Sequence, residues 1–294
     1  LKPSLRKILY SCFKRNLKKE VKVSQLAGYI SEKSAYHHGE ASLYEGIIGM
    51  AQNFVGANNI ELLEPKGQFG SRIASGGKDS ASPRYIFTNL SELSFHIFNP
   101  LDNPILQYNE DDGKKIEPVW YIPIIPMILV NGTKGIGTGF STDIMCHNPV
   151  QIIEFLEAKL NKSSSVEKLL IEPYYQGFKG KIYPCDDTRK KYIIKGCYEI
   201  LGNDKIRITE LPIGTWTQDY KEFLESILDT KTQAKGKSVK SSEEYIKDFN
   251  DMSTDLNVEF EITFYPGILS KLLFLTKTKN NNSKANSKII NLRI

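Results

Sequence analysis

Apolar side chains recur at helical spacing in three stretches of the first 55 residues. The first stretch follows a proline suited to an opening helical turn and contains Leu5, Ile8, Leu9, Cys12 and Phe13. A second, short helix is expected from Ser24, which would cap it, to Ile30. The third has its apolar residues on one side: Leu43, Ile47, Ile48, Ala51 and Phe54. Three helices with short links are typical of a helix-turn-helix unit.

The segment after these helices predicts a wing, that is, a strand, a turn and a return strand. The first strand would cover residues 60–63, and the glycine-containing turn and return strand would lie within 65–70. A polar, glycine-rich loop over 74–83 then leads to Arg84 and Tyr85, and another helical pattern covers 86–98.

A domain boundary is expected where Pro, Asn and Asp gather, in residues 99–113. Beyond it, helical patterns at 150–160 and 220–228 stand among runs typical of strands. These runs are 121–130, 182–183, 192–200, 206–211 and 258–264. From about residue 277 Asn and Lys dominate without periodicity, which predicts disorder. The pattern as a whole predicts an α+β protein.

Composition supports a folded protein with basic ends. The 294 residues are 40% hydrophobic and 25% charged, and no apolar run approaches the ~20 residues of a membrane span. Residues 1–24 hold eight Lys or Arg against one Glu, and residues 271–294 hold six Lys or Arg and no acid. This distribution favours a polyanionic partner, the alternative being solvated helix faces.

Metal and nucleotide sites find little support in the sequence. The four cysteines have no CxxC spacing, so neither zinc binding nor a disulfide framework is expected, and a reducing compartment fits best. The glycine run 132–139 matches neither GxxxxGK[ST] nor GxGxxG. It is interpreted either as a structural turn or as a turn that displays Ile136 as a wedge between base steps.

Two pairs of residues are candidates for chemistry. His37 and His38 precede the third helix, where a helix-turn-helix meets a phosphate backbone, although they are also consistent with capping or packing. Tyr85 is a weak nucleophile unless a positive charge favours its phenolate, and Arg84 stands beside it. Without further context, an Arg-Tyr pair is an ordinary surface feature.

Taken together, these motifs resemble one family, the eukaryotic-type DNA topoisomerases II (type IIA topoisomerases), in their breakage–reunion region. The motifs YHHGE and GGKDSASPRY are closer to the eukaryotic enzymes than to bacterial gyrase. The matching segments are Leu1–Tyr10, Ser34–Glu40, Ala51–Gly56, Gly67–Arg72, Gly76–Thr88, Glu117–Met127, Asn131–Gly139 and Glu210–Thr217. They are collinear and cover residues 1–265.

The resemblance implies a role for each matching residue. Tyr85 aligns with the tyrosine that forms a 5′-phosphotyrosyl bond, Arg84 with the arginine that stabilises the transition state, and Ile136 with the isoleucine that intercalates and bends DNA. The positions that contact or flank DNA are Lys2, Tyr36, Ser42 and Trp216. Further phosphate ligands in the same motifs are His37, His38, Arg72 and Lys78.

The resemblance also implies an architecture. We expect a winged-helix domain over 1–120, a mixed α/β tower domain over 121–265, and an Asn/Lys-rich, disordered tail over 266–294. Mg²⁺ and ATP would be bound by Toprim and ATPase domains that the motifs do not include, and we expect no metal site within these residues. The chain would then be a segment of a longer, homodimeric nuclear enzyme acting on double-stranded DNA and not on membranes, and inactive in cleavage by itself.

Departures from the family pattern leave an alternative open. The loop after Arg72 is longer by about one residue at Ala74-Ser75, and Gly214 replaces a basic residue. The pattern fades after residue 265, which leaves dimerisation through the family's C-terminal interface open. The alternative function is a non-catalytic DNA-binding remnant or architectural protein. A weaker third hypothesis is nucleotide binding by the glycine run.

Overall fold

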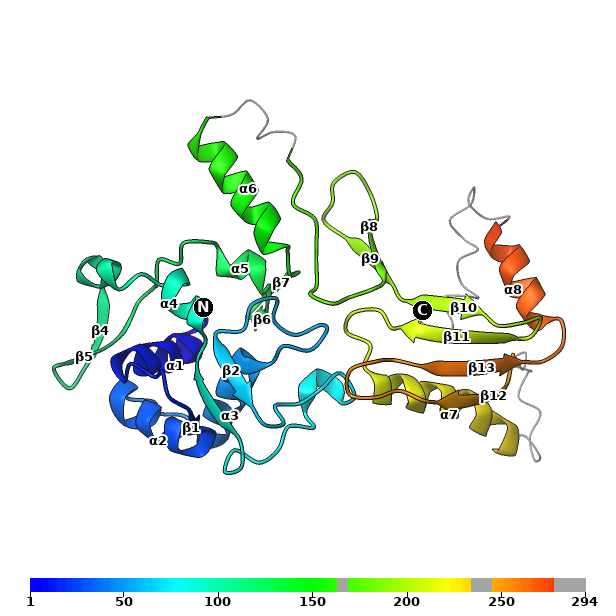
Figure 1. The fold of residues 1–294 in the computed structure, drawn as a ribbon, viewed down its shortest axis with the longest axis horizontal. Coiled ribbons are helices and arrows are strands. Elements are labelled where there is room, and N and C mark those ends of the chain that lie inside the picture. Colours follow the sequence, from blue (N-terminus) through cyan, green and yellow to red (C-terminus); the bar gives the residue numbers. More distant parts are fainter. Residues whose placement is uncertain (163–168, 234–244, 278–294) are drawn as a thin grey trace. The chain divides into compact units, whose positions relative to one another are not determined.

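The computed structural model describes residues 1–162, 169–233 and 245–277. The chain divides into two compact units (Figure 1). The first unit comprises residues 1–71 and 77–177, and the second comprises 72–76 and the residues from 178 onward. The short segment 72–76 therefore belongs to a different unit from the residues on either side of it.

Three helices form the centre of the first unit, as the apolar pattern predicted. They are α1 (Pro3–Lys14), α2 (Val23–Ser34) and α3 (Glu40–Ala51). α2 begins after Lys22 without a side-chain cap, so Ser24 is not its N-cap, and it ends at Ala35, which has a φ of 47°. The most deeply buried side chains of this core include Ile8, Leu9, Leu26, Ile30, Leu43 and Ile47.

A three-stranded antiparallel sheet lies beside these helices, with the order β1-β3-β2. The strands are β1 (Val21–Lys22), β2 (Leu63–Lys66) and β3 (Phe87–Leu90). The return strand of the wing is therefore β3 and does not lie within 65–70. The helix predicted over 86–98 is reduced to α4 (Glu92–Ile97), because Ser91 caps it by accepting a hydrogen bond from the Ser94 amide.

The remainder of the first unit consists of short elements and one longer helix. The elements are η1 (Ser75–Gly77, where the chain passes from one unit to the other), η2 (Pro100–Ile105), β4 (Tyr108–Asp111), β5 (Lys114–Pro118), α5 (Met127–Val130), β6 (Thr133–Gly137), β7 (Phe140–Ile144) and α6 (Pro149–Leu160). The strand predicted over 121–130 is wrong. Pro123 and Pro126 cannot donate to a strand ladder, and the segment ends in the short helix α5.

The compact units are not separated at residue 120. Ile125, Met127, Val130 and Ile152 are buried in the same core as the first three helices, so the division falls after Gly177. The Pro/Asn/Asp-rich composition of 99–113 predicted a boundary there, but the apolar side chains that follow it pack into the core of the first unit. The functional domains expected over 1–120 and 121–265 remain a prediction.

The second unit is built on a four-stranded antiparallel sheet with the order β10-β11-β13-β12. Its elements are β8 (Lys181–Pro184), β9 (Tyr192–Lys195), β10 (Cys197–Ile200), β11 (Lys205–Glu210), α7 (Thr217–Gln233), β12 (Ile246–Asp251), β13 (Phe260–Phe264) and α8 (Ile268–Lys277). Strands and α7 share a core that includes Ile208, Tyr220, Leu224 and Phe260.

Part of the predicted disordered tail is helical. Helix α8 covers Ile268–Lys277 and buries Leu269 and Leu272 against the core of the second unit. Leucines at this spacing share one helix face, which explains why the segment orders. Residues 278–294 lie outside the described residues. None of the described helices is long and apolar enough to cross a membrane.

Candidate functional site

Tyr85 lies at the surface, directly before a well-anchored strand. Its side chain is 71% exposed, whereas the next residue, Ile86, is buried and leads into β3. Its amide donates a hydrogen bond to the Ser82 carbonyl at 2.9 Å. The guanidinium carbon of Arg84 lies 6.0 Å from the centre of the Tyr85 ring. The phenol is therefore accessible and has a permanent cation beside it.

The N-terminal half of α3 lies next to this pair. Burial raises the pKa of Tyr44, and a hydrogen bond from its hydroxyl to Glu40 and the charge of that carboxylate raise it further; the charge of Arg84 acts in the opposite direction. Arg84 is thus close enough to Tyr44 for its charge to act on the phenol. Tyr44 was not among the predicted site residues; its i, i+4 spacing from Glu40, the last residue of the YHHGE motif, was the available signal.

The turn before α3 presents both histidines to solvent. The His37 side chain is 77% exposed, and its Nε2 lies 3.8 Å from Asp111 Oδ1. His38 is exposed and packs edge-on against Tyr36 with ring centres 5.3 Å apart. Tyr36 itself is 9% exposed, so its ring supports His38 and presents little surface to a ligand. Ser42, in the first turn of α3, is exposed.

Lys78 lies at the surface beside a loop whose two ends are joined by hydrogen bonds. Asp79 accepts hydrogen bonds from the backbone amide and the hydroxyl of Ser71. The Gln52 side-chain amide donates to the carbonyls of Phe69 at 2.9 Å and Gly77 at 3.3 Å. These bonds fix the backbone on both sides of segment 72–76. Lys78 is the residue after Gly77, so its exposed side chain starts from this fixed backbone.

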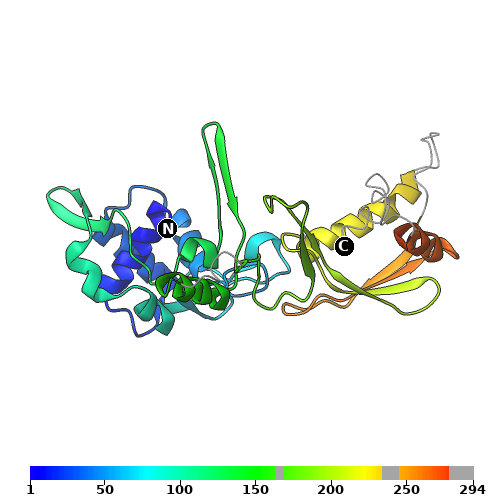
Figure 2. The same cartoon turned by 90° about the horizontal axis from the view of Figure 1, so that it is seen from above.

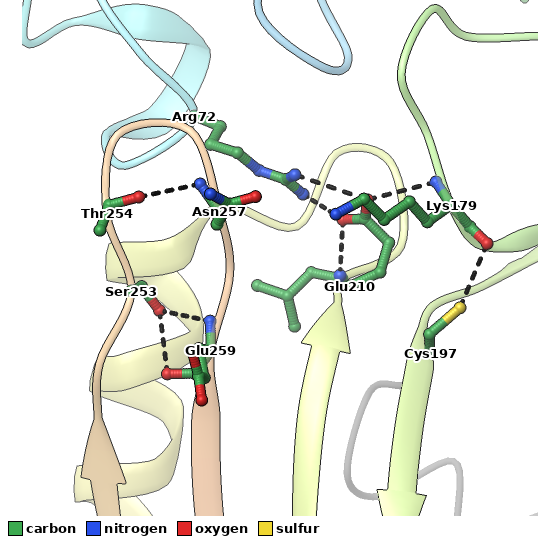
Figure 3. Close-up of polar contacts among 9 residues, drawn as sticks. Arg72, Lys179, Cys197, Glu210, Ser253, Thr254, Asn257 and Glu259 are labelled. Atoms are coloured by element: carbon green, nitrogen blue, oxygen red, sulfur yellow. Dashed lines mark hydrogen bonds and ion pairs between the residues drawn. The ribbon is translucent and has the colours of Figure 1, made fainter.

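Arg72 does not fit the predicted role of a phosphate ligand. Its side chain is 8% exposed and forms an ion pair with Glu210, which is 1% exposed (Figure 3). Glu210 also accepts hydrogen bonds from the amides of Lys179 and Leu211. Because a buried carboxylate requires a partner, the guanidinium serves the interior of the second unit instead of a ligand.

Trp216 also belongs to the second unit. It is partly exposed and directly precedes α7, whose first amides are held by segment 72–76. The Thr217 amide donates to the Arg72 carbonyl at 3.2 Å, and the Gln218 amide donates to the Ile73 carbonyl at 2.9 Å. The start of this helix is therefore fixed by the same segment that carries Arg72.

The glycine run forms a hairpin that displays Ile136. β6 pairs with β7 from Thr133 opposite Ile144 to Gly137 opposite Phe140, and Figure 2 shows this hairpin standing out from the rest of its unit. The Ile136 side chain is 92% exposed. The Lys2 ammonium donates a hydrogen bond to the Lys134 carbonyl at 2.7 Å. Strand, turn and strand leave no helix N-terminus to cradle a phosphate, so the nucleotide hypothesis loses its structural basis.

Among the described residues, no group of three His, Cys, Asp or Glu side chains is arranged to hold a metal ion. Asp111 is the last residue of β4 and Asp186 lies in a bend after β8, and each has a local partner. Asp111 lies near His37, and Asp186 accepts hydrogen bonds from the amide and hydroxyl of Thr188.

Comparisons with known proteins agree on one family. The family model that describes the A subunit of DNA gyrase/topoisomerase IV matches residues 1–292. DNA topoisomerase 2 of Drosophila melanogaster is 50% identical over 273 residues, which are 92% of this chain and 18% of that protein. DNA topoisomerase 2 of Saccharomyces cerevisiae is 47% identical over 270 residues, again 92% of this chain and 18% of that protein.

A solved structure shares the fold. The crystal structure of the Plasmodium falciparum topoisomerase II DNA-binding, cleavage and re-ligation domain superposes with a TM-score of 0.85 at 48% identity. The match covers 93% of this chain and 35% of that one. The α+β fold class is thereby confirmed, and the predicted winged-helix portion is consistent with this fold. The chain spans about a fifth of the length of the full-length relatives, at 18% in both cases named above.

Proposed function

Because the chain belongs to the DNA gyrase/topoisomerase IV family, we propose that it is the DNA-binding and DNA-cleaving segment of a type II DNA topoisomerase. The observation that carries this proposal is the exposed phenol of Tyr85 beside the Arg84 guanidinium. An accessible nucleophile with a permanent cation beside it is what attack on a phosphodiester requires.

In the proposed reaction, the Tyr85 oxygen attacks a backbone phosphorus and loses its proton. A bond forms between the phenol oxygen and the 5′-phosphate, the bond to the 3′-oxygen breaks, and that oxygen takes up a proton as it leaves. Arg84 stabilises the phenolate and the additional negative charge on the phosphoryl oxygens of the transition state. The phosphotyrosyl ester conserves the energy for religation, which is the reverse attack by the 3′-hydroxyl.

Further residues would hold and bend the duplex. The proposed backbone contacts are Lys2, Tyr36, His37, His38, Ser42, Lys78 and Trp216. Arg72 is withdrawn from this set because Glu210 occupies its guanidinium. Ile136, at 92% exposure on its hairpin, is the proposed wedge between base steps.

Cofactors and partners belong to the proposal for the whole protein. Relatives named DNA topoisomerase 2 are several times longer than this chain. We assign Mg²⁺ and ATP to Toprim and ATPase regions of such a longer protein, and no step above depends on a metal held by the described residues. The proposed partner is double-stranded DNA, the proposed assembly a homodimer and the proposed location the nucleus. One relative is a mitochondrial DNA topoisomerase 2, from Dictyostelium discoideum.

The test is covalent trapping. The native protein would be captured with an antibody to this chain, incubated with plasmid and Mg²⁺, denatured rapidly, and its DNA-linked peptide mapped by mass spectrometry. We expect an adduct on Tyr85 that is lost in Tyr85→Phe. Tyr183→Phe, at a tyrosine of the second unit that is 44% exposed, is the matched control and should keep the adduct.

Two outcomes would contradict the proposal. An adduct that persists in Tyr85→Phe would place the nucleophile elsewhere. Intact DNA binding without any adduct would favour the alternative, a non-catalytic DNA-binding or architectural protein.

A further inference from the structure

Asn59, in the link between α3 and β2, makes an unusual number of hydrogen bonds with its side chain. Its Nδ2 lies 3.0 Å from each of three carbonyl oxygens, those of Val130, His147 and Tyr174. Its Oδ1 accepts a hydrogen bond from the Gln176 amide at 2.8 Å. The two N–H groups of the amide are therefore shared among three acceptors, and both ends of the side chain are used.

Two of these partners, Val130 and His147, flank the hairpin that displays Ile136. Val130 ends α5 three residues before β6, and His147 follows β7 by three residues. A second pair of bonds strengthens the attachment on the β6 side: the Asn131 side chain accepts from the Ile60 amide at 3.0 Å and donates to the Ile60 carbonyl at 2.7 Å. The segment at Asn59 and Ile60 is thus hydrogen-bonded both to residues just before β6 and to a residue just after β7.

The hairpin has little other support along its length. Most residues of β6 and β7 are exposed, and Lys2 contributes one bond to the Lys134 carbonyl. At about 3.3 Å per residue, a five-residue arm is about 16 Å long, so a tilt of about 10° at its base moves the tip by about 3 Å. The position of Ile136 is therefore decided at the base.

We propose that Asn59 is a positioning residue for DNA bending: it fixes the base of the β6–β7 hairpin and so aims Ile136 at the duplex. This inference rests on the proposed function, in which Ile136 is the wedge. A purely structural role for Asn59 would affect folding and would act independently of Ile136.

The first measurement needs no DNA. Removing the Asn59 amide leaves three part-buried carbonyl oxygens without this donor, which should shift the local opening equilibrium at the hairpin base by about tenfold. In the 294-residue chain, hydrogen exchange of the hairpin amides should accelerate about tenfold in Asn59→Ala. Asn58→Ala is the matched control. It removes two bonds, to the carbonyls of Gly49 and Gln52, that do not involve the hairpin base.

The second measurement is the bend of a short duplex labelled at both ends for energy transfer, at saturating protein. We expect Ile136→Ala and Asn59→Ala each to lower the bent fraction, and the double variant to bend no less than Ile136→Ala alone. Asn58→Ala should bend DNA as the wild type does. If Asn59→Ala fails to fold, Asn59→Ser, which keeps one hydroxyl donor, carries both measurements.

The outcomes separate the inference from the function on which it rests. Unchanged bending by Ile136→Ala, in a chain that binds DNA, would contradict the wedge itself. Reduced bending by Ile136→Ala with normal bending by Asn59→Ala would overturn the inference, as would additive losses in the double variant. Hairpin exchange that does not accelerate in the Asn59 variant would overturn it without any reference to DNA.

Discussion

At the scale of single residues, cations of two neighbouring motifs have different environments. Arg84 and Lys78 are exposed, whereas Arg72 is buried against Glu210. An arginine can be buried only where its charge is matched, and Glu210, held in turn by the Lys179 and Leu211 amides, supplies that match. Because its carboxylate partner is buried, Arg72 cannot reach a phosphate, whereas Lys78 and Arg84 remain accessible to one.

The Arg72–Glu210 pair yields a stability prediction. Arg72→Ala leaves a buried carboxylate uncompensated, so we expect the second unit to lose about 3–5 kcal/mol of its free energy of unfolding. Lys78→Ala, at an exposed cation, should change it by less than about 0.5 kcal/mol. The measurement is urea unfolding followed by the fluorescence of Trp216 in a Trp120→Phe background. Arg72→Met combined with Glu210→Leu should recover most of the loss; an equal loss in Lys78→Ala would contradict this account.

At the scale of elements, the β6–β7 hairpin depends on glycines for two different reasons. Gly132 has a φ of +63°, and a Cβ there would lie 2.3 Å from the Ile144 carbonyl oxygen. Gly139, in the turn, has a φ of +78° with nothing within 4 Å of a built Cβ. Gly132 is required both by its positive φ and by the close approach of the Ile144 carbonyl, whereas Gly139 is required by its positive φ alone.

This difference predicts unequal effects of alanine. Gly139→Ala should cost only the left-handed strain, about 1–2 kcal/mol, whereas Gly132→Ala must also displace β7 from the hairpin base. Hydrogen exchange of the hairpin amides should accelerate in both variants and distinctly more in Gly132→Ala. Equal acceleration would show that the strands move apart without cost at their base.

At the scale of the whole molecule, each compact unit has its own apolar core, and basic residues gather towards the chain ends. Contacts from Lys and Arg to phosphates release counterions, so DNA affinity should fall steeply with salt. That fall reports the number of phosphate contacts and not catalysis, because the catalytic proposal and the non-catalytic alternative both require DNA binding.

The salt dependence therefore tests individual contacts. Lys78→Ala should reduce the slope of log K against log salt concentration by about 1, since one phosphate contact is lost. Lys247→Ala, at an exposed lysine of β12, is the control and should leave the slope unchanged. Fluorescence anisotropy of a labelled duplex between low and moderate salt gives both slopes. An unchanged slope in Lys78→Ala would remove this residue from the proposed interface.

The sequence by itself determined the family, the three helices of the first unit and the loop that precedes Tyr85, because helical periodicity and motif spacing are local properties. Tertiary structure decided the rest. β3 as the return strand, the unit division after Gly177 and the Arg72–Glu210 pair, 138 residues apart in sequence, depend on contacts between distant segments. The same holds for Asn59, whose amide meets carbonyls 71 to 115 residues away, since local spacing does not specify such partners.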